Sequence, residues 1–180
     1  MIGVLVSGEG TNLQALLEAG LPIVAVASNN TKAKALDRAV AAGIEAGAFP
    51  ETEFDSREAR DTAMADFLAE RGVDLVVCAG YMRLLTKPFL DRFPGRIVNT
   101  HSAPLPEFPG KTPIEDVLAA GVPETAATVH YVDDGVDTGA VIAAERVPVH
   151  PGDTPDTLRE RVQAVEHRLL PAAVRTLCER

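Results

Sequence analysis

Short apolar runs alternate with helical patterns along the first hundred residues of the chain. The apolar runs are rich in β-branched residues and are bounded by glycine, asparagine or proline, which is typical of buried strands. They predict strands at residues 2–7, 23–28, 44–49, 73–80 and 96–99, of which 44–49 has the weakest pattern. Helical spacing with a closing glycine predicts helices within 11–20, 32–43 and 55–72. This alternation indicates parallel strands with helices on both faces of the sheet.

The pattern changes in the last part of the chain. Two apolar runs, 124–134 and 140–149, are separated only by GVDTG, which is too short for a parallel crossover. We therefore expect two antiparallel neighbours. A final helix should start after Thr154, with Pro155 at its first position, and should kink or break at Pro171. The predicted fold class is α/β, a Rossmann-like three-layer α/β/α arrangement with a mixed, mostly parallel sheet and an antiparallel pair near its C-terminal end.

Composition narrows the class of protein. The 180 residues suit one domain, residues 1–180, and the net charge of −9 argues against partners such as nucleic acid or a membrane surface. Two cysteines, Cys78 and Cys178, do not suggest a disulfide framework, so we expect a reducing compartment and a cytoplasmic protein. The N-terminus lacks the pattern of a signal peptide, and no apolar stretch reaches the ~18 residues of a membrane span.

The sequence SGEGTN joins the first predicted strand to the first helix. Its glycines allow the backbone to approach a ligand closely, and a helix N-terminus favours an anion. The dinucleotide fingerprint requires a third glycine where Leu13 stands, and the Walker motif is absent. The loop is therefore better suited to a single phosphate than to a nucleotide diphosphate. The alternative is a structural turn in which Thr11 or Asn12 caps the helix.

Among the four histidines, His101 has the most suggestive position. It stands at the carboxyl end of a predicted parallel strand, where open α/β sheets bind ligands. His130 lies inside a predicted strand and is expected to be structural, and His150 precedes a proline in a loop. The histidines and cysteines do not have the spacing of a metal site, so we expect no metal. Asp137 lies in the turn sequence DDGVDTG, which by itself is typical of a solvated loop.

Several motifs taken together are more specific than any one of them. In chain order they are SGEGTN, AGYMRLL, NTHSAPLPEFPG, DDGVDTG and VEHRLLP. With these motifs the chain resembles the phosphoribosylglycinamide formyltransferase family of purine synthesis, and the resemblance covers nearly all of the sequence. It implies a mixed sheet flanked by helices. It also implies formyl transfer from the co-substrate 10-formyltetrahydrofolate to the glycyl amine of glycinamide ribonucleotide, without a metal.

The resemblance also implies three groups of site residues. The catalytic group is Asn99, His101 and Asp137. The residues that would bind the ribonucleotide are Gly10, Thr11 and Asn12 at its phosphate and Glu166 at its glycyl amine. The residues that would bind the folate are Arg57, Met82, Arg83, Leu84, Leu85 and again Asn99. A cis peptide bond is expected between Leu105 and Pro106.

The chemistry explains why these residue types would be needed. Attack of an amine on the formyl carbon creates an oxyanion, which requires hydrogen-bond donors fixed in advance. Asn99 and His101 are two apart on an extended chain, so an amide and a protonated imidazole can address one oxygen. A carboxylate at Asp137 would favour the protonated imidazole and could relay protons between the amine and the folate nitrogen.

The chain also departs from the family pattern. Ser102 stands where the family usually has proline, and Lys111-Thr112-Pro113 stand where a histidine is often found. The chain also ends at Arg180, without the C-terminal segment of many relatives. A methionyl-tRNA formyltransferase or a formyltetrahydrofolate hydrolase should carry a further domain, so both are less favoured. A formyltransferase acting on a sugar-nucleotide amine stays open, as does a non-catalytic sugar-phosphate or folate-binding protein. We expect a monomer or a weak homodimer.

Overall fold

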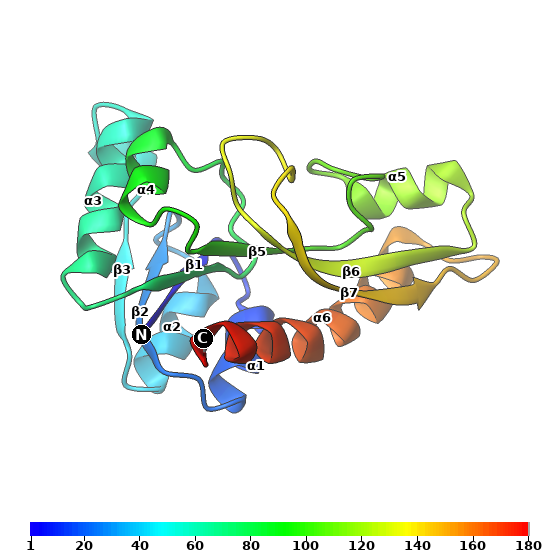
Figure 1. Cartoon of the computed structure of the whole chain (residues 1–180), viewed down its shortest axis with the longest axis horizontal. Helices are drawn as coiled ribbons and strands as arrows, with labels where there is room; N and C mark the ends of the chain where they lie inside the picture. The colour runs from blue at the N-terminus through cyan, green and yellow to red at the C-terminus, as the bar shows by residue number, and fades with distance from the viewer. Residues whose placement is uncertain (180) are drawn as a thin grey trace.

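The computed structural model describes residues 1–179, which are built around a seven-stranded sheet (Figure 1). The strand order is β3-β2-β1-β4-β5-β6-β7. The strands are β1 (Ile2–Val6), β2 (Ile23–Ser28), β3 (Glu45–Ala48), β4 (Leu75–Cys78), β5 (Ile97–His101), β6 (Glu124–Tyr131) and β7 (Val141–Pro148). The pairs among β1 to β5 are parallel, whereas β6 is antiparallel to both β5 and β7. The predicted fold class, including its antiparallel pair, is confirmed.

The helices are mostly where the sequence predicts them. They are α1 (Thr11–Glu18), α2 (Lys34–Ala41), α3 (Arg57–Ala69), α4 (Lys87–Arg92), α5 (Pro113–Ala120) and α6 (Pro155–Cys178), with a 3-10 turn η1 (Glu51–Glu53). The sequence did not predict α4 and α5, which are short and lie in proline-containing segments. No helix within residues 1–179 is both long and apolar enough to cross a membrane.

Side chains cap the starts of two helices, α3 and α6. The Ser56 side chain accepts a hydrogen bond from the backbone N–H of Ala59 at the start of α3, and Thr154 forms a capping box at the start of α6. The predicted break at Pro171 is absent, because α6 runs on to Cys178. Pro171 is buried, and its neighbours Leu170 and Val174 pack into the core, so tertiary contacts hold the helix together across the missing N–H.

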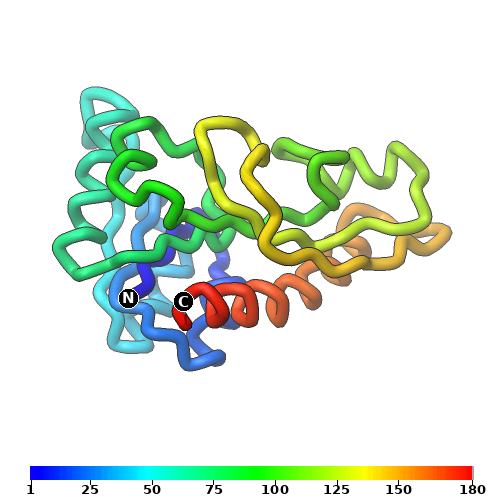
Figure 2. The backbone as a smooth tube through the Cα atoms, in the orientation of Figure 1, coloured from blue at the N-terminus to red at the C-terminus, as the bar shows by residue number. Residues whose placement is uncertain are grey.

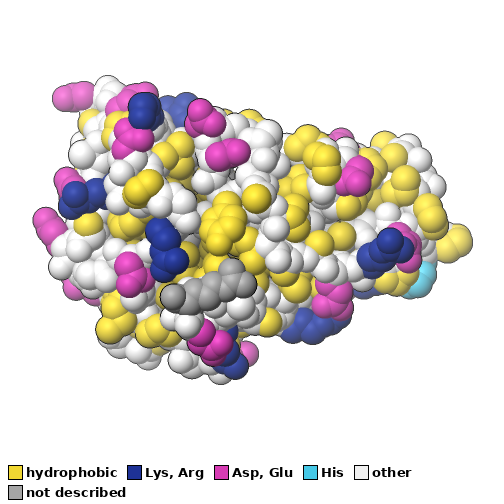
Figure 3. Space-filling model, viewed as in Figure 1, with side chains coloured by type: hydrophobic (Ala, Val, Ile, Leu, Met, Phe, Trp, Pro, Cys, Tyr) yellow, Lys and Arg dark blue, Asp and Glu magenta, His cyan; other side chains and the backbone are white. Residues whose placement is uncertain are grey.

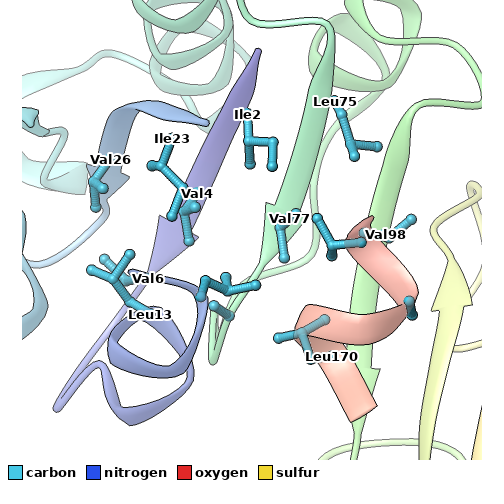
Figure 4. Close-up of a cluster of buried hydrophobic side chains, with 14 of the residues drawn as sticks. Ile2, Val4, Val6, Leu13, Ile23, Val26, Leu75, Val77, Val98 and Leu170 are labelled. Atoms are coloured by element: carbon cyan, nitrogen blue, oxygen red, sulfur yellow. The ribbon is translucent and has the colours of Figure 1, made fainter. Parts of the chain in front are cut away.

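Apolar side chains divide the molecule into layers. One cluster joins Leu13 of α1 and Leu170 of α6 to one face of the sheet, where Val4 and Val77 project toward them (Figure 4). A second cluster, from α3 and α4, covers the opposite face, and α5 packs on α6 beside β6 and β7 (Figure 1). Acidic and basic side chains are interspersed over the surface in Figure 3. The central parallel strands β1 and β4 are therefore buried on both faces, as parallel strands require.

The strand order creates a crevice at one edge of the sheet. From β1 the chain continues outward to β2 and β3, whereas from β4 it continues the other way to β5. Ligands of open α/β sheets bind where the order reverses, outside the carboxyl ends of the strands. The loops that follow β1, β4 and β5 all leave from this edge, and they contain most of the site residues that the sequence predicts.

A buried ion pair in α3 fixes one of these loops. Arg60 and Asp61 are fully buried, and the guanidinium donates to Asp61 Oδ1 from Nε at 2.9 Å and from Nη2 at 2.7 Å. The other carboxylate oxygen, Oδ2, accepts the backbone N–H and the hydroxyl of Thr86 at 2.7 and 2.8 Å. Both oxygens of Asp61 are therefore used, and α3 anchors the end of the loop that follows β4.

We expect Asp61→Ala to lower the free energy of unfolding by about 3 kcal/mol, because the fully buried charge of Arg60 would lose its buried partner and keep only its ion pair with the more exposed Glu51. Urea denaturation measures this loss. The matched control is Arg146→Ala, which breaks an exposed ion pair with Glu124 and should cost about 0–1 kcal/mol. If both variants lost the same small amount, the buried pair would not be the anchor described here.

Candidate active site

The end of β5 presents an amide and an imidazole on one face of the sheet. Asn99 and His101 follow Ile97 at alternate positions of the strand. Antiparallel pairing places His130 of β6 opposite Asn99 and Thr128 opposite His101. The Asn99 side-chain nitrogen lies 3.3 Å from His130 Nε2, and the rings of His101 and His130 meet edge-on with centroids 6.5 Å apart. The strand pairing thus builds a polar cluster from β5 and β6.

Asp137 reaches this cluster from the loop between β6 and β7. Its carboxylate lies between the two histidines, with Oδ2 3.6 Å from His101 Nδ1 and Oδ1 3.5 Å from His130 Nε2. The backbone N–H of Gly110 donates to Oδ2 at 2.9 Å. The structure therefore brings the three predicted catalytic residues together, although Asp137 comes from a separate segment of the chain.

The backbone at Asp137 is unusual. Within residues 1–179, Asp137 is the one non-glycine residue with a positive φ, at 54°. Aspartate tolerates this left-handed region better than most residues, and such conformations concentrate at functional sites. Close by, a Cβ added to Gly139 would lie only 1.8 Å from the backbone oxygen of Tyr131, so the loop folds tightly back on β6. The conformation of this loop sets the position of the carboxylate.

The two nitrogens of His101 have different partners. Nε2 lies 2.6 Å from the backbone oxygen of Phe108, which can only accept, so Nε2 carries a hydrogen. Nδ1 faces Asp137, and a protonated ring would donate on both sides. His101 is nearly buried and is held from both ends. For His101 to donate to a substrate oxygen, as the sequence predicts, one of these two contacts must give way.

His130 belongs to the same cluster, although the sequence did not predict this. It is 2% exposed, and burial lowers the pKa of its imidazole, while the hydrogen bond to the Tyr131 oxygen and the charge of Asp137 act in the opposite direction. Nδ1 donates to the Tyr131 oxygen at 2.9 Å, which leaves the Nε2 lone pair for an N–H of Asn99. The other Asn99 N–H makes no hydrogen bond among the described residues. The sequence could not show that His130 contacts Asn99, because this contact depends on how β5 pairs with β6.

The start of α1 is suited to an anion. Gly10, not Thr11 or Asn12, is the N-cap, with φ at 76°, and no side chain of the described residues caps the helix. A Cβ at Gly10 would lie 2.6 Å from the Cβ of Ala35 and 2.8 Å from its Cα, so only glycine fits. The first N–H groups of a helix lack intrahelical partners and attract negative charge. The predicted N-cap at Thr11 or Asn12 is therefore wrong, and phosphate binding by this loop stays a prediction.

Glu166 links this helix to the end of β5. It lies on α6, is 3% exposed, and accepts the Asn12 side-chain N–H at Oε2 (3.2 Å) and the Ser102 hydroxyl at Oε1 (2.6 Å). Ser102 follows His101 directly in the chain. The structure therefore places Glu166 between the predicted phosphate loop and the end of β5. Neither hydrogen bond was predicted from the sequence, because the partners are far apart in the chain.

The predicted folate contacts lie together at the other side of the crevice. Arg57 Nη2 donates to the backbone oxygen of Leu84 at 3.0 Å, and Arg83 Nε lies 3.6 Å from a carboxylate oxygen of Glu51. Met82 is 74% exposed, and its backbone N–H is held by the Ser7 hydroxyl at 2.8 Å. The loop after β4 is thus fixed through its backbone while its side chains stay exposed. The peptide bond between Leu105 and Pro106 is cis, as the resemblance implies.

A cleft of about 680 Å³ opens beside this loop. Apolar side chains from the two sides line it, and the loop between β6 and β7, yellow in Figure 2, supplies acidic and backbone groups at its rim. The lining residues include Leu85, Leu90, Ile97, Val132 and Asp134. Charged groups lie on both sides of the cleft, Lys87 and Asp91 on α4 and Asp133 and Asp134 on the facing loop, so its apolar floor with a polar rim is suited to a flat heterocycle. Among residues 1–179, no three His, Cys, Asp or Glu side chains cluster closely enough to hold a metal ion.

Comparison with known proteins agrees with this geometry. Residues 1–174 match the family model described as formyl transferase. A phosphoribosylglycinamide formyltransferase of Mycobacterium tuberculosis is 44% identical over 179 residues, which cover 97% of this chain and 83% of that protein. The structure of glycinamide ribonucleotide transformylase 1 from Symbiobacterium toebii has a TM-score of 0.96 and 46% identity, and the match covers 99% of this chain and 87% of that one.

Longer relatives match over a small part of their length. The trifunctional purine biosynthetic protein adenosine-3 of Drosophila pseudoobscura pseudoobscura is 41% identical over 184 residues, and the match covers 98% of this chain. The chain spans only 14% of that protein. The family model, the mycobacterial relative and the shared fold agree along nearly the whole sequence. The chain therefore belongs to the formyl transferase family, within the group of phosphoribosylglycinamide formyltransferases.

Proposed function

We propose that this chain transfers a formyl group from 10-formyltetrahydrofolate to the glycyl amine of glycinamide ribonucleotide, a step of de novo purine synthesis. The observation that carries the proposal is the convergence of Asn99, His101 and Asp137 at the carboxyl end of β5. A protein that only binds sugar phosphates or folates would not need this combination of an oxyanion donor, an imidazole and a carboxylate. Family membership supports the same reaction class.

The two substrates would approach from opposite sides of the crevice. The ribonucleotide phosphate would bind the N–H groups at Gly10, Thr11 and Asn12, and Glu166 would meet the glycyl amine. The folate would occupy the cleft beside Leu85, with Arg57 and residues 82–85 at its rim and Asn99 near the formyl group. The contact chain from Asn12 through Glu166 to Ser102 supports this order, because it leads from the phosphate site to His101.

In the reaction, the neutral glycyl amine attacks the formyl carbon, and a carbon–nitrogen bond forms as the carbonyl oxygen becomes an oxyanion. The free N–H of Asn99 donates to that oxygen, with His101 as a second donor. The attacking nitrogen loses a proton, the bond from the carbon to the folate nitrogen breaks, and that nitrogen gains a proton. Asp137 relays these protons and stays beside His101 Nδ1, while Nε2 leaves the Phe108 oxygen to donate to the oxyanion. No metal takes part in this sequence.

The proposal includes the organisation of the protein. Residues 1–180 would form a single formyltransferase domain that acts in the cytoplasm as a monomer or a weak homodimer, with small molecules as its ligands and neither nucleic acid nor a membrane as partner. The mixed surface charge and the net charge of −9 favour small-molecule substrates over a polyanion.

We expect the purified protein to convert glycinamide ribonucleotide and 10-formyltetrahydrofolate into formylglycinamide ribonucleotide and tetrahydrofolate, followed by absorbance and by mass spectrometry of the nucleotide. Parallel reactions contain a sugar-nucleotide amine in place of the ribonucleotide, or the folate alone. Faster formylation of the sugar-nucleotide amine would replace the proposed acceptor with the alternative one. Absence of any transfer, in protein that binds one of the ligands, would favour the non-catalytic alternative.

Asp137→Asn is expected to lower kcat by about 10²–10⁴-fold, because the proton relay loses its carboxylate. Asparagine also tolerates a positive φ, so the loop should keep its shape. The same substitution removes a charge that raises the pKa of His130, so the His130 imidazole should titrate at a still lower pH by NMR. Asp156→Asn, at a side chain that is 96% exposed, is the matched control. A near-normal kcat with an unmoved His130 pKa would reduce Asp137 to a loop residue.

Thr11→Asp should affect stability and binding in opposite directions. A carboxylate at the first position of α1 interacts favourably with the helix N-terminus and should raise the free energy of unfolding by about 0.3–1 kcal/mol. The same charge should repel the ribonucleotide phosphate and raise the KM for the ribonucleotide, with little change in the KM for the folate. Thr11→Asn, of similar shape but neutral, should show neither effect. Equal weakening of both substrates would place the phosphate elsewhere.

A further inference from the structure

Ser102 makes a contact that the resemblance does not imply. It stands where the family pattern has proline, directly after His101, and its hydroxyl donates to Glu166 Oε1 at 2.6 Å. Proline has no side-chain donor, so this contact depends on the residue that this chain carries. Among the hydrogen bonds of the described residues, it is also the one that ties α6 to the end of β5 at the predicted amine site.

The environment of Glu166 makes the contact important. The side chain is 3% exposed, and none of the ion pairs among residues 1–179 includes it. Burial of a carboxylate is costly unless hydrogen bonds compensate for the lost water. Here two neutral donors, Asn12 and Ser102, each take one oxygen. Together they fix the rotation of the carboxylate, which neither donor could do alone.

The same cluster keeps acceptors for a ligand. The Asn12 side-chain oxygen is buried and has no hydrogen-bond partner among the described residues. Each oxygen of the Glu166 carboxylate also has a further lone pair beyond the bond it already accepts. Acceptors with spare capacity, but no cation, suit a donor such as a primary amine or an ammonium group.

We propose that Ser102 is a positioning residue that aims the Glu166 carboxylate at the amine of the acceptor substrate. The inference rests on the proposed function and adds a specific residue to it. Ser102 acts through Glu166 and does not itself touch the reacting atoms. Because Ser102 is bonded directly to His101, the contact also fixes the distance between the amine site and the catalytic strand.

The local backbone allows the hydroxyl to be tested separately from the fold. On one side of Ser102, His101 is held in β5 by pairing with Thr128. On the other side, the Thr128 hydroxyl donates to the backbone oxygen of Ala103 at 2.8 Å. The chain is therefore pinned before and after Ser102, and removal of the hydroxyl should leave the backbone in place.

The experiment compares Ser102→Ala, Ser102→Cys and Ser102→Thr in steady-state kinetics with both substrates. Ser102→Ala should raise the KM for the ribonucleotide about tenfold or more, as expected for a lost hydrogen bond to a charged group, and leave the KM for the folate unchanged. Ser102→Thr keeps the hydroxyl and should restore the KM to within about twofold, whereas Ser102→Cys, a weaker donor, should lie between them.

Two controls separate positioning from general damage. Thr125→Val removes a buried hydroxyl that has no partner among residues 1–179, so it should leave both KM values unchanged. In a Glu166→Gln background, Ser102→Ala should add little to the KM, since a positioning residue acts only through its partner. Additive effects in this double-mutant cycle would show that Ser102 acts independently of Glu166 and would overturn the inference.

The outcomes also separate this inference from the proposed function. If the wild-type protein is active and Ser102→Ala has the same KM as Thr125→Val, the inference is wrong and the function stands. If no formyl transfer occurs, the positioning role of Ser102 is tested by calorimetric titration with glycinamide ribonucleotide. Weaker binding by Ser102→Ala than by the wild type would support the positioning role, and equal binding, or none to either, would overturn it. Should Ser102→Ala fail to fold, the KM for the ribonucleotide is compared between Ser102→Cys and Ser102→Thr. A higher KM for Ser102→Cys would support the inference, and equal values would overturn it.

Discussion

The arrangement of the site depends on one constraint, the placement of the Asp137 carboxylate between His101 and His130. The antiparallel register of β5 and β6 brings the two imidazoles to one face of the sheet, and the tight loop before β7 returns the carboxylate to them. The positive φ at Asp137 and the hydrogen bond from Gly110 fix it there. A sheet with a parallel strand next to β5 would need a long crossover at this point. The reversal of direction at β6 therefore makes this cluster of Asp137 with the two histidines possible.

Three buried or partly buried carboxylates are held in the same way. Asp61, Asp137 and Glu166 each accept hydrogen bonds from groups on other segments of the chain. A carboxylate without such donors would be costly in the interior, so each one requires its partners to be in place. As a result, Asp61 joins α3 to the loop after β4, Asp137 joins the loop between β6 and β7 to the loop after β5, and Glu166 joins α6 to both α1 and the end of β5.

Much of the fold could be predicted because it follows from local patterns. Apolar runs bounded by glycine gave the strands, the short GVDTG connection gave the antiparallel pair, and Thr154 with Pro155 gave the start of α6. Contacts between distant segments could not be predicted in this way. The importance of His130 depends on the β5–β6 register, and the bond from Ser102 to Glu166 depends on how α6 packs across the sheet. The continuation of α6 through Pro171 is likewise decided by the core and not by local propensity.

The crevice also couples its two sides through the end of β1. The Ser7 hydroxyl donates to the Asn29 side-chain oxygen at 2.6 Å and accepts the backbone N–H of Met82 at 2.8 Å. Ser7 lies just before the glycine loop at the start of α1, and Met82 opens the loop that reaches Arg57. The backbone of the predicted folate loop is therefore held at the end of β1, the same strand end from which the predicted phosphate loop starts. Because β1 is central and fully buried, a rigid strand sets the distance between the predicted phosphate loop and the predicted folate loop, and the loops need only supply the contacts.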